Sequence, residues 1–334
     1  MFLKDKKIGG DIMTDYVRMA GACVLAFTIC FSDLWAQTTN TANPILQPGK
    51  TVMDTWMRDP FVCVGPDGNY YLTGTSKDED FFRKNEGIRI WKSADLKKWE
   101  PLGLVWSFAK DMTWQAPVPD PKSGKPRQAI WAPELHYIKG AWYIPYCKNY
   151  GGTGILRSKT AKVEGPYEDI KKDGPLTDRI DTSLFVDDDS VVYFIYQDAQ
   201  IARMKDDMSG LAEKPHPIRS AAGKSVGFEA CHIFKKDGRY YLIGATHIKV
   251  NGKNTYSSQV MSAGKLAGPW SEPTLAILHG GHGNIFRDRD GQWWSTIFAP
   301  WMKFGLVPVE FRADGGIGPM VQGKVNQRSE EGAK

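Results

Sequence analysis

The chain has 334 residues, which is enough for one large all-β domain or for two smaller domains. Hydrophobic residues make up 42% and aromatic residues 12%, including 12 Trp and 13 Tyr, as in a globular protein rich in flat side chains. The net charge of +5 comes from single Lys and Arg residues interleaved with Asp and Glu, and this absence of a basic block argues against a nucleic-acid partner.

The N-terminal segment has the pattern of an export signal. An apolar run covers residues 19–31, follows Arg18 and precedes a polar stretch of Gln, Thr and Asn. A membrane-spanning helix needs about 20 apolar residues, so we expect no stable membrane insertion. We predict a cleaved export signal over residues 1–36, a polar linker over 37–44 and a secreted or periplasmic protein. A buried N-terminal helix is the alternative, which the lack of periodic polar positions disfavours.

One short pattern occurs five times after this segment. Each copy is a turn with Gly or Asp followed by an alternating aromatic or β-branched run, which is typical of a β-hairpin. The turns lie 72, 50, 48 and 53 residues apart and begin at Asp67, Lys139, Asp189, Asp237 and Asp290. Three intervals fit one four-stranded blade per repeat, and the longer first interval leaves room for an insertion between residues 78 and 125. Helix signals are nearly absent, so we predict an all-β, five-bladed β-propeller over residues 45–321 and a hydrophilic tail over 322–334.

The cysteines indicate no disulfide framework. Cys23 and Cys30 fall within the predicted signal, which leaves Cys63, Cys147 and Cys231. An odd number without metal-ligand spacing predicts buried free thiols.

A fixed position ahead of each turn is occupied by ionisable residues. Counting nine residues back from the second turn residue gives an acid or a histidine in four repeats: Asp59, Asp181, Glu229 and His282. The second repeat has Trp131 there, with Glu134 three residues later. The first strand of each propeller blade lines the central channel, so we expect these side chains to converge at strand mouths. Any single carboxylate here is equally well explained by turn capping, but several like charges in register destabilise the fold unless they serve a function.

Convergent carboxylates near aromatic side chains have a chemical use. Hydrolysis of a glycosidic bond needs one carboxyl that protonates the leaving oxygen and one carboxylate that activates water on the opposite ring face. Crowded negative charge separates the two roles because it raises the pKa of one group. We therefore predict a glycoside hydrolase with a carbohydrate partner, its pocket walled by four candidate aromatic residues: Trp56, Trp114, Trp131 and Trp301.

Six short motifs in one order resemble glycoside hydrolase family 43, over nearly the whole mature chain. They begin at Arg58, Asp67, Trp131, Ile180, Phe228 and Gly281. The resemblance implies a five-bladed propeller and an inverting mechanism, with Asp59 as general base, Glu229 as general acid and Asp181 as the residue that orients the acid and tunes its pKa. We also expect substrate contacts from five residues: Arg58, Trp131, Glu134, Phe228 and Trp301.

The resemblance also concerns a cation. It places His282 near the channel centre, where it would help to hold a structural Ca2+ or its waters. A histidine hydrogen-bonded in the channel without a metal is the alternative. We expect that no cofactor is required.

Two positions depart from the family pattern and leave the substrate open. Thr182 stands where Pro is common, and Ala230-Cys231 stands where Gly-Pro is common, although both carboxylates are kept. The leading hypothesis is an exo-acting enzyme that removes terminal furanose or pentose residues from plant or microbial polysaccharide, of the α-L-arabinofuranosidase or β-galactofuranosidase type. A β-xylosidase and an endo-arabinanase stay open. A glycan-binding propeller without catalysis predicts a lost carboxylate, and a protein-interaction propeller predicts uncharged strand mouths; neither is seen.

Overall fold

The computed structural model describes residues 51–76, 83–250, 252–298 and 302–319. The predicted export signal, linker and tail lie outside these residues, as does Trp301. Within the described ranges, no helix has both the length and the apolar character needed to cross a membrane.

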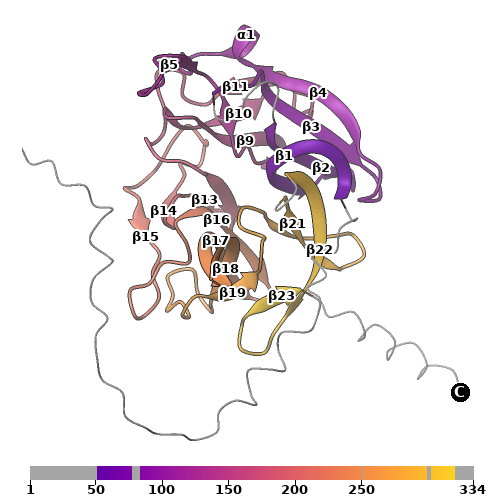
Figure 1. Cartoon of the computed structure of the whole chain (residues 1–334), viewed down its shortest axis with the longest axis vertical. Helices are drawn as coiled ribbons and strands as arrows, with labels where there is room; N and C mark the ends of the chain where they lie inside the picture. Colours follow the sequence, from indigo (N-terminus) through magenta and orange to yellow (C-terminus); the bar gives the residue numbers. More distant parts are fainter. Residues whose placement is uncertain (1–50, 77–82, 251, 299–301, 320–334) are drawn as a thin grey trace, which may run out of the picture. The chain divides into compact units, whose positions relative to one another are not determined.

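Five antiparallel blades follow one another along the chain, and the first and the fifth are joined in one eight-stranded sheet (Figure 1). The first blade comprises β1 (Thr51–Val64), β2 (Tyr70–Ser76), β3 (Gly87–Ser93) and β4 (Glu100–Ser107). In the second, β7 (Ile130–Trp131) and β8 (His136–Ile138) both pair with β9 (Ala141–Lys148), which is followed by β10 (Gly152–Ser158) and β11 (Tyr167–Asp169).

The last three blades repeat the four-stranded pattern. The third comprises β12 (Ser183–Val186), β13 (Val192–Tyr196), β14 (Gln200–Arg203) and β15 (His216–Pro217). The fourth comprises β16 (Glu229–Lys236), β17 (Arg239–Val250), β18 (Lys253–Ala263) and β19 (Thr274–Ile277). The fifth comprises β20 (Ile285–Arg287), β21 (Trp293–Ile297), β22 (Lys303–Phe311) and β23 (Ile317–Pro319).

Hydrophobic clusters join each blade to the next. One cluster packs β2 and β3 against β9, and the next packs β9 against β12 and β13. Two further clusters join the third blade to the fourth and the fourth to the fifth. The last contains Met57 and Leu72 of the first blade and Phe286 and Phe304 of the fifth, so the series of interfaces closes into a ring. The prediction of a five-bladed β-propeller is confirmed.

Strand β1 closes this ring by pairing with two blades. Thr51 and Trp56 pair with β22, whereas the segment from Met57 to Val64 pairs with β2 (Figure 1). The prediction that Asp59 lies at the mouth of a strand is therefore wrong: it lies in the middle of β1, because the chain is already bonded to the fifth blade before it enters the first.

The predicted hairpins and insertion are present. The chain turns at Lys139-Gly140 and at Asp237-Gly238, and all four residues have positive φ angles, between 49° and 81°, as tight turns between strands require. The long first interval holds a short helix and a two-stranded sheet between the first two blades: α1 (Phe108–Asp111), β5 (Val118–Pro119) and β6 (Pro126–Arg127).

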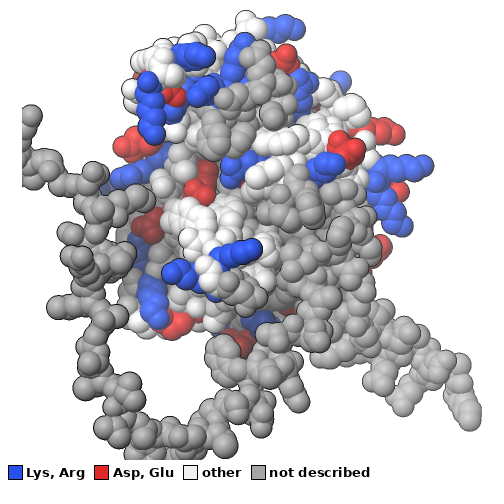
Figure 2. All heavy atoms as spheres, in the orientation of Figure 1, with Lys and Arg blue, Asp and Glu red and all other residues white. Residues whose placement is uncertain are grey.

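Cysteines and surface charge follow the sequence closely. The three cysteines in the described residues are free, and Cys147 and Cys231 are buried. Cys63 is only half-buried, because it packs at the margin of the cluster between the first two blades. On the face seen in Figure 2, basic and acidic side chains are interspersed, as their interleaving in the sequence predicts.

Candidate active site

A β-bulge at the same place in four blades builds the site. Two residues of the inner strand oppose one residue of its neighbour between Arg58 and Phe61, and again between Glu229 and His232. Backbone pairing gives the same extra residue at two further places: between Trp131 and Glu134 in the second blade and between Ile180 and Ser183 in the third. Such bulges redirect side chains and are common beside active sites.

The bulged residues share an uncommon backbone conformation. The φ angle is +54° at Asp59, +44° at Ala132, +55° at Asp181 and +56° at Ala230. Positive φ strains residues other than glycine, and strain of this kind concentrates at functional sites. Four inner strands thus make the same strained turn, and two of the four bulged residues are aspartates.

The bulges correct the predicted equivalence of the carboxylates. Asp59 and Asp181 are bulged residues, but Glu229 precedes its bulge and is equivalent to Arg58 and Trp131. A count of nine from the turn hides this shift because the turn between β1 and β2 is longer than the two-residue turn between β16 and β17. The aspartates are 8% exposed, whereas Glu229 is half-buried, so the two kinds of carboxylate occupy different environments.

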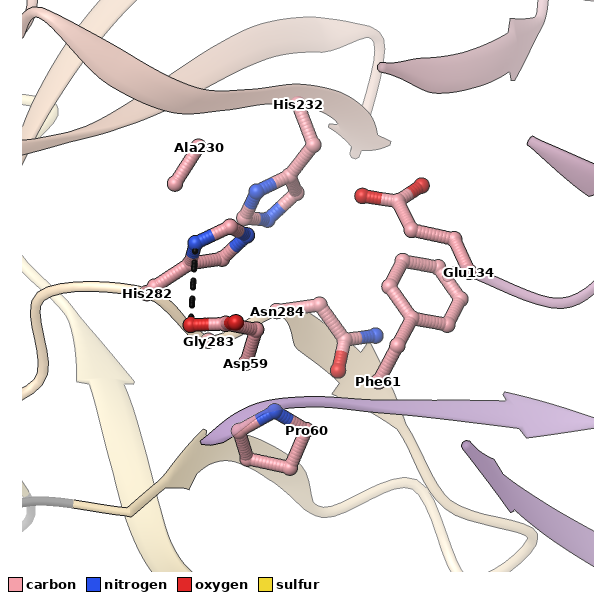
Figure 3. A pocket seen from close by; sticks show the side chains of 9 residues that line it. All are labelled: Asp59, Pro60, Phe61, Glu134, Ala230, His232, His282, Gly283 and Asn284. Carbon is pink, nitrogen blue, oxygen red and sulfur yellow. Dashed lines mark ion pairs between the residues drawn. The ribbon is translucent and has the colours of Figure 1, made fainter. Parts of the chain in front are cut away.

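The structure brings the predicted ionisable residues together. His282 Nδ1 lies 3.3 Å from Asp59 Oδ1, an ion pair drawn in Figure 3, and 3.7 Å from Asp181 Oδ2. The same Asp181 oxygen accepts a hydrogen bond of 3.3 Å from Ala230 N, which is the residue after Glu229. Residues of the first, third, fourth and fifth blades therefore meet in one network.

Asp59 and Glu229 each accept a hydrogen bond from a hydroxyl group of their own. Thr75 Oγ1 donates to Asp59 Oδ2 at 2.7 Å and accepts from Ala132 N at 2.8 Å, so it fixes Asp59 against the second blade. Tyr256 donates its hydroxyl to Glu229 Oε1 at 2.7 Å. Burial and the nearby Glu229 carboxylate raise the pKa of Tyr256, which keeps the phenol protonated as a donor.

The charges of Asp181 and His282 depend on each other. Burial raises the pKa of Asp181 to about 7, the charge of His282 opposes this rise, and the carboxylates Glu229 and Asp59 add to it. Burial alone would lower the pKa of His282, but Asp59, Asp181 and Glu229 outweigh burial and raise it. The protonation of Asp181 is therefore coupled to that of His282.

A cavity of about 10 Å3, no larger than one water needs, lies among the residues drawn in Figure 3. Glu134, one of the predicted substrate contacts, lines this cavity and pairs with His136 at 2.8 Å. His232 also lines it, and burial lowers the pKa of His232 to about 3. Among the described residues, no group of three or more His, Cys, Asp or Glu side chains is arranged to hold a metal ion. The cation expected at His282 has no support in this donor set.

The other predicted binding residues fall into two groups: partly exposed residues beside the bulges, and residues packed between blades. The Arg58 guanidinium lies 5.2 Å from the centre of the Phe298 ring, and Trp131 packs edge-on against Tyr150 at 5.7 Å. Phe228 is exposed next to Glu229. Trp114 instead stacks on Tyr146 against the first hydrophobic cluster, and Trp56 lies in the part of β1 that pairs with β22.

Replacing Asp181 by Asn should stabilise the protein more at pH 8 than at pH 4. The raised pKa means that the folded protein keeps a proton that the unfolded chain releases above about pH 4, so stability falls as the pH rises to about 7. The amide removes this dependence, and the difference in unfolding free energy should grow by about 4 kcal/mol across that range. Denaturant unfolding of both proteins at several pH values measures it, with the exposed Asp206→Asn as control. A difference that stays constant with pH would contradict the prediction.

Several known proteins resemble this chain. The family model described as "Glycosyl hydrolases family 43" matches residues 48–315. The chain is 25% identical over 243 residues to the "Extracellular exo-alpha-(1->5)-L-arabinofuranosidase ArbA" of Cellvibrio japonicus, which covers 64% of this chain and 68% of that protein. It is 29% identical over 288 residues to the "Beta-D-galactofuranosidase xynD" of Aspergillus niger, which covers 78% of each.

Other matches bear on length and on fold. The chain spans about half of two further curated relatives, 50% of one from Escherichia coli and 48% of one from Butyrivibrio fibrisolvens. The solved structure of an alpha-L-arabinofuranosidase from Clostridium thermocellum superposes with a TM-score of 0.64 at 20% identity, over 80% of this chain and 95% of that chain. At that identity the likeness shows the shared fold alone.

Proposed function

The chain belongs to glycosyl hydrolase family 43, and on this basis we propose that it is an inverting, exo-acting glycosidase that removes terminal furanose or pentose residues from plant or microbial polysaccharide. The observation that carries the proposal is the network at the bulges. The strained Asp59 and Asp181 both lie close to His282. Glu229 is the residue just before the bulge of its own strand, and the Tyr256 hydroxyl holds it.

In the proposed reaction, two carboxyl groups act on opposite faces of the sugar ring. Asp59 takes a proton from a water molecule as its oxygen attacks the anomeric carbon, and the bond to the leaving oxygen breaks. Glu229 gives its proton to that oxygen, so the leaving sugar departs neutral. Asp181 orients the acid through Ala230 N, which it binds next to Glu229. The attack from behind inverts the anomeric configuration.

Each proposed catalytic carboxyl group is held in place by contacts to its oxygens. Thr75 Oγ1 donates to Asp59 Oδ2, and His282 Nδ1 lies 3.3 Å from Asp59 Oδ1, so the proposed base is held from two sides. The Tyr256 hydroxyl donates to Oε1 of Glu229, so Oε2 is the oxygen that we propose faces the leaving oxygen. No cofactor takes part in the proposed reaction, because the acid and the base both come from the chain.

The proposed substrate class rests on the names of the relatives and on two residues beside the bulges. The relatives named above carry the names of an arabinofuranosidase and a galactofuranosidase, and both names describe removal of a furanose. We propose Arg58 and Trp131 as substrate contacts. Each lies just before the bulge of its own strand, as Glu229 does. We further propose that the protein is exported through residues 1–36, as the word "Extracellular" in the name of the Cellvibrio japonicus relative suggests for that protein.

Proton NMR of the anomeric signal during hydrolysis tests the proposal. We expect the purified protein to cleave para-nitrophenyl α-L-arabinofuranoside, β-D-galactofuranoside or β-D-xyloside and to release first the anomer opposite to that of the substrate. The three compounds, run in parallel, also separate the sugar classes. A first-formed product with retained configuration would overturn the assignment of Asp59 as a base, and silence on all three would favour a glycan-binding propeller.

A further inference from the structure

The fourth blade carries a hairpin that is longer than its counterpart in the third. Strands β17 and β18 have 12 and 11 residues, whereas β13 and β14 have 5 and 4. The pairing of β17 with β18 continues without a break to Val250 and Lys253. The part of the hairpin after Ala245, which faces the bulge at Glu229, is therefore an addition to the basic blade.

This addition carries an aromatic group beside Glu229. His247 and Tyr256 are direct cross-strand partners, with ring centres 5.4 Å apart. Phe228 lies flat on His247, at 5.3 Å between ring centres and 5° between ring planes, and its ring centre is 6.3 Å from that of Tyr256. The Phe228 backbone is fixed by a hydrogen bond of 2.9 Å from its N–H to Ala245 O.

Two glycines make room for this aromatic group. A Cβ atom at Gly281 would clash with the Tyr256 ring, and a Cβ atom at Gly227 would clash with the carbonyl oxygen of Ala245. Both Tyr256 and the segment that carries Phe228 therefore lie closer to their neighbours than any other residue type allows. The position of the aromatic group is built into the backbone.

Phe228 offers a flat apolar surface next to Glu229, the proposed acid. One face of its ring is covered by His247, and 38% of the residue is exposed. Glu229 follows it in the chain and is tied to the same aromatic group through Tyr256. The leaving oxygen must come within hydrogen-bond reach of the acid, so the ring attached to that oxygen is brought beside Phe228.

A second exposed aromatic residue lies on the side of the base. Tyr150 is 60% exposed, contacts Trp131 edge-on and lies under the Arg127 guanidinium at 4.0 Å. Trp131 precedes Ala132, whose N–H binds Thr75 and thereby Asp59. The leaving group departs from the face opposite the base, so Tyr150 is not placed to receive it.

From these contacts we propose that Phe228, backed by His247, forms the binding subsite for the leaving sugar and selects leaving groups that are rings with an apolar face. The proposal rests on the proposed function, since it needs Glu229 to act on the leaving oxygen. It assigns to this pair the preference for a saccharide over a small alcohol as leaving group. In this proposal the terminal sugar, whose anomeric carbon is attacked, does not contact Phe228 or His247.

A comparison of two substrates with the same cleaved sugar tests the proposal. One is a disaccharide whose leaving group is a pyranose, and the other is the methyl glycoside, whose leaving methanol cannot stack. Phe228→Ala should lower kcat/KM for the disaccharide about 10-fold, mainly through KM, and should change that for the methyl glycoside less than about twofold. His247→Ala should act in the same direction, and Tyr150→Ala should leave the ratio of the two substrates unchanged.

Phe228→Leu separates stacking from folding, because it keeps apolar bulk without a flat ring. We expect it to lose most of the disaccharide preference at an unchanged melting temperature. An unchanged ratio in both Phe228 variants, or a ratio that falls in Tyr150→Ala instead, would overturn the assignment of this subsite while leaving the hydrolase intact. Wild-type protein that cleaves neither substrate would overturn the proposed function itself.

Discussion

Asp59→Asn should abolish hydrolysis of every glycoside, whatever its leaving group, with a fall in kcat/KM of about 10³-fold or more. The amide has the size of the carboxylate and can still accept from Thr75 Oγ1, so the site should keep its shape. The amide cannot take a proton from the attacking water. A better leaving group does not compensate, because the water must be activated whatever the leaving group is. Initial rates on an aryl glycoside and on an oligosaccharide measure the effect.

Azide provides a direct control on this interpretation. Asp59→Ala leaves space beside the anomeric carbon, and azide is a nucleophile that carries no proton to remove. We expect azide to restore cleavage of an aryl glycoside and to give a glycosyl azide of inverted configuration, seen by NMR. Substantial hydrolysis by Asp59→Asn, or retention in the azide product, would show that Asp59 is not the base.

The sequence allowed the blades to be predicted because hairpin chemistry is local. Asp237-Gly238 and Lys139-Gly140 turn the chain within two residues, and the alternating runs that follow them form strands whichever blade they belong to. The closure of the ring was not predicted. It depends on the pairing of Thr51 with Gly305, which are distant in the sequence and carry no turn signal.

The predicted site residues converge, but the register of the acid differs from the prediction. Counting from the turn treats Glu229 as the equivalent of Asp59, whereas the bulges make Ala230 its equivalent. A shift of one residue turns a side chain toward another face of a strand. This shift separates the half-buried Glu229 from the buried aspartates, and turn lengths, which vary between blades, conceal it in the sequence.

The donors that hold the carboxylates could not be found by the repeat. Thr75 lies on β2 and Tyr256 on β18, so neither occupies an inner strand. Their roles follow from contacts of 2.7 Å between side chains that are 16 and 27 residues apart in the chain. A useful sequence signal would have been the glycine at Gly281, which the Tyr256 ring requires, although a single glycine also fits an ordinary turn.

Glu229→Gln should separate substrates by the basicity of their leaving groups. An oligosaccharide leaves as an alkoxide unless it is protonated, so kcat/KM should fall by about 10²–10⁴-fold on such a substrate. A nitrophenolate is stable without the proton, so the loss on the para-nitrophenyl glycoside should be at least about tenfold smaller. A series of aryl glycosides with increasing phenol pKa measures this as a steeper dependence of log kcat/KM on that pKa in the variant.

Tyr256→Phe is the matched control for the acid. It removes the hydroxyl that binds Glu229 Oε1 but keeps the ring against Phe228 and His247. If Glu229 donates the proton, this variant should show the same selective loss on poor leaving groups, smaller in size, because the acid is still present but no longer fixed. An equal loss on good and poor leaving groups in Glu229→Gln would mean that Glu229 contributes binding or charge instead. The proton would then have to come from another of the converging groups, and Asp181, whose pKa burial raises to about 7, is the carboxyl group to test next.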